Sequence, residues 1–127
     1  MKLVLKSLIV LTSLPLLGLG LAALCTPNAM LGLFDLIPKG VYGYNTIRAD
    51  LGGLLIGSGL MILIGLWKRN KNWFDVAIMM MGLLLFGRVV STIADGWSNM
   101  AIPAIVVEVF AVTVLTIAKK SWKVIEA

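Results

Sequence analysis

Residues 47–67 of the chain read IRADLGGLLIGSGLMILIGLW, and this stretch decides the class of fold. After Arg48 and Asp50 near its start, it contains no further ionisable side chain. At about 1.5 Å per residue, a helix of this length crosses the roughly 30 Å hydrocarbon core of a lipid bilayer. The stretch therefore predicts a membrane-spanning helix that carries two ions near one end.

Three further apolar stretches of similar length predict three more spans, at residues 3–25, 73–93 and 102–118. The whole chain is 60% hydrophobic and 13% charged, whereas soluble domains contain about 25% charged residues. Little chain remains outside the spans. We therefore predict an all-α integral membrane protein, in which residues 1–127 form a single four-helix bundle.

Basic residues indicate the orientation of this bundle, because loops rich in Lys and Arg stay in the cytoplasm. They gather at the start of the first predicted span, between the second and third, and after the fourth: Lys2, Lys6, Lys68, Arg69, Lys71, Lys119, Lys120 and Lys123. The chain is therefore expected to have both termini inside. The net charge of +5 is a signal of topology, and no nucleic-acid partner is implied.

The chain contains no histidine and a single cysteine, Cys25. The usual ligand sets for transition metals and haem are missing, and an internal disulfide is excluded. No metal site and no cofactor are expected.

The first outer loop contains an apolar segment between two prolines, at residues 27–39. It is too short to span a bilayer and too apolar to stay fully in water. We expect a short interfacial helix or a re-entrant lid. Residues 40–45 then predict a turn, and Asn45 or Thr46 can cap the following helix.

Five ionisable residues lie within or at the ends of the predicted spans, toward their outer side. Inserting an ion at bilayer depth costs at least about 2.5 kcal/mol, so these side chains must be paired, hydrated or needed for function. Because the third and fourth spans run antiparallel, Arg88 and Glu108 fall at similar depth, and we predict that they meet. If the charges serve only to hold helices together, Arg48 is expected to pair with Asp50, Asp95 or Glu108. We call this set the polar cluster: Arg48, Asp50, Arg88, Asp95 and Glu108.

The polar cluster favours a binding role. Two arginines and three acids leave a formal charge of about −1, which a bound molecule, an ion, water or a proton must balance. Arginine recognises carboxylate, phosphate and other oxygen-bearing groups. The leading hypothesis is a site for membrane lipid or another small amphipathic molecule, formed by Arg48, Asp50, Arg88, Ser91, Asp95 and Glu108.

Two alternatives remain open. Glu108 and Asp95 are candidate acid and base groups of an intramembrane isomerase or hydrolase, with Arg88 as their electrostatic partner. Alternatively, the charges only hold helices together, and the chain is a structural subunit. In that case, the small residues Gly52, Gly53 and Gly57 are packing positions. Gly53 and Gly57 in particular have the spacing that lets a second copy or a partner protein dock.

Two motifs resemble a known family. They are the run from Asn45 to Leu54, which contains Arg48, Asp50 and two adjacent glycines, and the run from Gly87 to Gly96, which is followed by Glu108. They are similar to the small bacterial membrane proteins catalogued as domain of unknown function 4345, which are broadly like the DoxX-like proteins in architecture. Asp50 and Leu51 stand where that family usually has Glu and an aromatic residue.

The resemblance implies a four-span fold in a bacterial inner membrane. It points to Arg48, Asp50, Gly52, Gly53, Arg88, Asp95, Gly96 and Glu108 as the characteristic residues. It implies no reaction.

Overall fold

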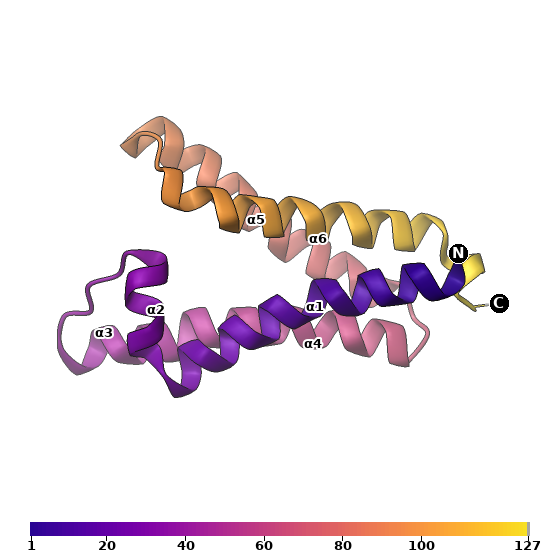
Figure 1. Cartoon of the computed structure of the whole chain (residues 1–127), viewed down its shortest axis with the longest axis horizontal. Coiled ribbons are helices and arrows are strands. Elements are labelled where there is room, and N and C mark those ends of the chain that lie inside the picture. The colour runs from indigo at the N-terminus through magenta and orange to yellow at the C-terminus, as the bar shows by residue number, and fades with distance from the viewer. Residues whose placement is uncertain (127) are drawn as a thin grey trace.

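The four apolar stretches form long helices in the computed structural model, which describes residues 1–126 (Figure 1). No strand occurs within these residues. In chain order the helices are α1 (Lys2–Cys25), α2 (Pro27–Phe34), α3 (Gly40–Thr46), the π-helix η1 (Ile47–Gly52), α4 (Gly53–Trp67), α5 (Asn72–Asp95), the 3-10 helix η2 (Asn99–Ala101), α6 (Ile102–Lys120) and α7 (Trp122–Glu126).

Four helical stretches are long and apolar enough to cross a membrane, as the sequence predicts: Lys2–Cys25, Gly40–Trp67, Asn72–Asp95 and Asn99–Lys120. The second begins earlier than expected, because the predicted turn at residues 40–45 is helical. The predicted cap is also wrong. The hydroxyl of Thr46 donates to the carbonyl of Tyr42 at 3.1 Å, a bond inside the helix. Helix α3 passes through η1 into α4 without a break, so no cap is needed there.

Close contact between α1 and α4 depends on glycine. A Cβ atom at Gly20 would lie 2.7 Å from the side chain of Ile56 and 2.8 Å from its backbone nitrogen. A Cβ at Gly59 would lie 2.7 Å from Leu17. These positions let the two backbones approach closely, as small residues do in membrane helix pairs.

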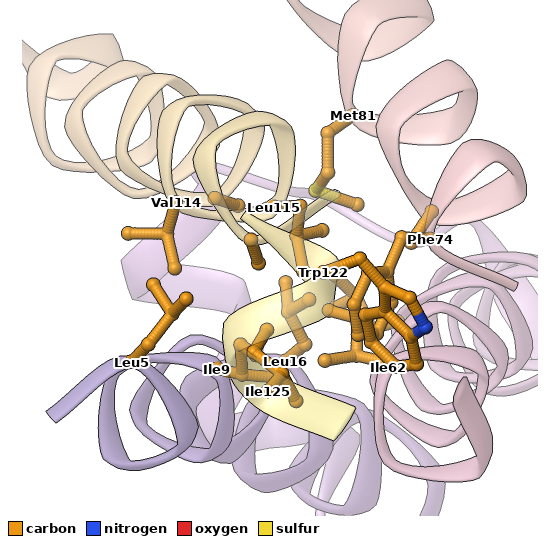
Figure 2. Close-up of a cluster of buried hydrophobic side chains, with 14 residues drawn as sticks. Leu5, Ile9, Leu16, Ile62, Phe74, Met81, Val114, Leu115, Trp122 and Ile125 are labelled. Carbon is orange, nitrogen blue, oxygen red and sulfur yellow. The ribbon is translucent and has the colours of Figure 1, made fainter. Parts of the chain in front are cut away.

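The main hydrophobic core lies at the end of the bundle that holds the N-terminus, residues 68–71 and α7, which we call the terminal end. Phe74, Ile9 and Ile62 are fully buried there. The ring of Phe74 meets that of Trp122 from α7 edge to face, with centroids 5.5 Å apart (Figure 2). The short helix α7 thus closes this end of the bundle.

At the opposite end, which we call the loop end, the pair α1 and α4 diverges from the pair α5 and α6 (Figure 1). The loop end holds residues 26–46 and 96–101. Here α2 folds back beside α1, and its Met30 packs against Ala23 and Ile47 in a small second cluster. The segment predicted to be a short helix is therefore helical over Pro27–Phe34. Its position at a membrane interface stays a prediction.

Candidate functional site

An ion pair joins α5 and α6 near the loop end. The guanidinium of Arg88 donates from Nε to both carboxylate oxygens of Glu108, at 3.1 and 2.9 Å, and from Nη2 to Oε1 at 2.8 Å. The predicted meeting of these two residues is confirmed. Antiparallel helices bring them level because each lies about two turns from the loop end of its own helix.

The pair is shielded unequally. The side chain of Glu108 is 7% exposed and that of Arg88 is 30% exposed. A carboxylate buried this deeply is costly unless charge-assisted hydrogen bonds compensate it, and Arg88 supplies three. The two side chains therefore act as one unit, and Arg88 is its more exposed partner.

A cavity of about 450 Å³ lies beside this ion pair, between the diverging helix pairs. This loop-end cavity is within the size range of small-molecule sites. Its wall is apolar apart from Arg88, Glu108 and Ser98. The other lining residues are Leu16 and Leu19 of α1, Leu33 and Phe34 of α2, Leu51 and Leu55 of η1 and α4, Met81 and Leu84 of α5, and Met100, Ala101, Pro103, Ala104 and Val107.

A second hollow of about 340 Å³ shares Arg88 with this cavity. It also contains Ser91 and Thr92 of α5. Arg88 therefore stands between two hollows, with Glu108 on one side only.

Arg48 pairs with no acid among residues 1–126, so that prediction is wrong. Its Nη1 atom donates to the backbone carbonyl of Leu24. The last carbonyls of a helix have no intrahelical partner, and α1 ends at Cys25. Arg48 lies in the π-helical turn η1, and it satisfies the end of α1 and joins α1 to the second span.

Asp50 lies apart from the loop-end cavity. It lines a groove of about 480 Å³ with Gly53, Gly57 and Met80. Among the described residues it makes no ion pair. A Cβ added at Gly53 or Gly57 would meet nothing within 4 Å, whereas a Cβ added at Gly52 would lie 3.3 Å from the carbonyl oxygen of Gly20. Of the three predicted packing glycines, only Gly52 would place a Cβ against a neighbouring helix.

Ser91 and Asp95 bond to each other near the end of α5, where the hydroxyl donates to Oδ2 at 3.0 Å. Both are exposed. Neither lines the loop-end cavity, although Ser91 lines the hollow beside it. The polar cluster is thus divided, and the cavity itself contains one arginine and one glutamate with no net charge.

Most of the apolar residues that form the cavity wall carry no signal of that role in the sequence. The first span carries no residue of the polar cluster, yet its Leu16 and Leu19 line the cavity. For Phe34 the sequence contains one signal of burial, because this residue lies in a segment too apolar to stay in water. No group of three potential metal ligands occurs among residues 1–126.

These features define a small multi-span membrane protein with an apolar cavity beside a buried ion pair. A family model described as Domain of unknown function (DUF4345) matches residues 4–118. The chain belongs to this family, as the resemblance of its motifs predicted. No curated protein and no solved structure gives a significant match.

Proposed function

We propose that this protein binds a membrane lipid or another small amphipathic molecule in the loop-end cavity. The observation that carries the proposal is the juxtaposition of an apolar cavity of about 450 Å³ with the Arg88 and Glu108 pair. Binding sites for small molecules combine such apolar walls with a few polar groups that fix orientation. Arg88 and Glu108 supply those polar groups.

An ion pair with only a structural role has no need of a cavity. Apolar cavities of about 150 Å³ already take up benzene, and the cavity here is about three times larger. Membrane proteins are surrounded by molecules of the right polarity to enter it. Binding therefore accounts for both the pair and the space, whereas helix association accounts only for the pair.

The expected orientation places this site on the outer side of a bacterial inner membrane. The basic residues at the terminal end favour a cytoplasmic location for that end. The cavity then opens near the outer leaflet, and its ligand enters from there.

Native mass spectrometry of the gently extracted protein tests the proposal. We expect a discrete bound mass in the natural protein that is lost in Arg88→Ala and reduced in Glu108→Gln. Asp50→Asn is the matched control, because it neutralises a carboxylate outside the cavity and should keep the bound mass. An absent bound mass, or one unaffected by either change, contradicts the proposal.

A related proposal is that helix α2 acts as a lid, because its Leu33 and Phe34 line part of the cavity. Phe34→Ala should speed exchange of the bound molecule, as should deletion of residues 27–39. Unchanged exchange kinetics in both variants would mean that α2 is a passive part of the wall.

A second candidate function is assembly through the groove that contains Asp50, Gly53 and Gly57. Its support is that both glycines have open space where a Cβ would lie, while small residues are favoured where membrane helices meet. The occupant is a second copy or a membrane partner protein. Unchanged oligomer size after replacement of both glycines by Leu rules the groove out as an interface between copies.

The intramembrane isomerase or hydrolase has less support. Glu108 is occupied by three hydrogen bonds from Arg88, and Asp95 is bonded to Ser91 outside the cavity. An acid and base pair on one substrate would need both carboxyl groups at the same cavity.

A further inference from the structure

The hydrogen bonds of Arg88 leave one side of its guanidinium free. Glu108 accepts from Nε and Nη2. Among the described residues no acceptor is found for Nη1, and this nitrogen is not among buried polar atoms lacking a partner. It is therefore accessible, with two N–H donors available to a molecule in one of the hollows that Arg88 lines.

The charge of Arg88 is already balanced. Within the part of the chain that the structure describes, Glu108 is the only acid that lines the loop-end cavity and Arg88 is the only base. An anionic head group would place a second negative charge beside Glu108 in a site of low polarity, where an uncompensated ion is costly. A cationic head group finds no free carboxylate there. A neutral oxygen acceptor meets neither obstacle.

The volume limits the rest of the molecule. A cavity of about 150 Å³ holds a benzene ring, so a cavity of about 450 Å³ holds about three times as many atoms, or about 18 non-hydrogen atoms. That is one aliphatic chain with a small head, and much less than a lipid with two chains. Flexible Leu and Met side chains form much of the wall, and they adapt to such a chain.

We infer that the ligand is a single-chain neutral lipid whose carbonyl or hydroxyl oxygen accepts a hydrogen bond from Nη1 of Arg88. This inference rests on the proposed function and specifies its ligand class. Glu108 acts here as a specificity residue, because it neutralises Arg88 and excludes anionic heads.

The test compares two probes with the same chain, hexadecanol and hexadecyl sulfate. Binding is measured to the whole protein in nanodiscs of phosphatidylcholine, with empty nanodiscs subtracted. We expect the natural protein to prefer hexadecanol by about tenfold or more. Glu108→Gln should reverse the preference, because Arg88 then lacks a counter-ion. The ratio of hexadecanol to hexadecyl sulfate binding is compared between the natural protein and Glu108→Gln. Partitioning of the probes into the lipid is the same for both proteins and therefore cancels.

Two further variants separate the possible failures. Glu108→Asp keeps the carboxylate and should keep the preference for hexadecanol, and Ala104→Phe narrows the cavity and should weaken both probes. If the natural protein prefers the sulfate and Ala104→Phe weakens it, the inference is overturned while the proposed function stands. If Ala104→Phe affects neither probe, the cavity is not the binding site and both fail. If Glu108→Gln does not fold, the ratio of the natural protein is compared with that of Ala104→Phe, so that partitioning into the lipid again cancels and the cavity-dependent difference decides the ligand class.

Discussion

The two ends of this bundle are built on different principles. At the terminal end, Phe74 and Ile62 are fully buried and Trp122 closes the core with an edge-to-face ring contact. At the loop end, the same four long helices separate around a cavity of about 450 Å³ with an ion pair in its wall. The core of the terminal end is packed and apolar, while the loop end is hollow and has a buried ion pair in its cavity wall.

The difference shows how a small membrane protein can hold a site without a separate domain. Lipid is as apolar as leucine, so the terminal end is held by close packing of side chains and not by escape from water. A firm contact at that end lets the helices diverge at the other. The loop end is free to carry polar groups because the packing that joins the two helix pairs lies at the terminal end.

The largest expected effect tests whether the ion pair supports the loop end. Glu108→Ala should lower the free energy of unfolding by about 3 to 5 kcal/mol, because it leaves Arg88 uncompensated within the membrane. The swapped variant Arg88→Glu with Glu108→Arg should recover part of that loss. Unfolding by denaturing detergent measures both. A swapped variant no more stable than either single change would mean that direct pairing is not what stabilises the loop end.

The next effect compares one phenylalanine from each end. Phe74→Ala should cost about 3 kcal/mol of unfolding free energy, because it opens a cavity in a packed core. Phe34→Ala should cost about 1 kcal/mol or less, because its ring already borders a cavity that other molecules can fill. The same unfolding assay compares them. Equal losses would contradict the contrast between the two ends.

One glycine of α1 and one of α4 should change the stability in opposite directions when replaced by alanine. Gly20→Ala should destabilise the protein by about 1 to 3 kcal/mol, because the new Cβ would lie 2.7 Å from Ile56. Gly53→Ala should stabilise it by up to about 1 kcal/mol, because the position is open and alanine favours a helix. Thermal unfolding followed by circular dichroism measures both changes. Destabilisation by Gly53→Ala would show that this face is packed in the assembled protein.

The smallest effect concerns the ion pair between Lys119 and Asp75 at the terminal end. Its side chains are 39% and 49% exposed. Pairs this exposed contribute about 0 to 1 kcal/mol. Asp75→Asn should therefore change the unfolding free energy far less than Glu108→Gln, although both changes neutralise a paired carboxylate. Comparable losses would mean that burial does not determine how much each ion pair contributes to the free energy of unfolding.

Much of the fold could be predicted because the relevant signals are local. Length and hydropathy predict each of the four spans from its own stretch of sequence. The structure changes only where the spans begin and end. The start of the second span was missed because Gly40, Gly43 and Asn45 favour turns in isolation. In the folded chain these residues continue a long helix, whose own hydrogen bonds outweigh that preference.

The candidate site was predicted unevenly, for reasons that particular residues make clear. Arg88 and Glu108 could be matched by counting turns on antiparallel helices, since each needed a partner at the same depth. The partner of Arg48 is a backbone carbonyl at the end of α1, and no residue type in the sequence marks such an acceptor. Asp50 was assigned to the same cluster on depth alone, but the direction in which it faces depends on how α4 packs.

The sequence by itself determined that this is a four-span membrane protein and that Arg88 and Glu108 meet. Both conclusions depend on helix length, hydropathy and the cost of unpaired ions, which are properties of the chain. Only the tertiary structure decided which ionisable residues share a cavity and that the cavity exists. The physical reason is that a cavity depends on the angle at which helix pairs pack, and that angle is set jointly by side chains far apart in the sequence.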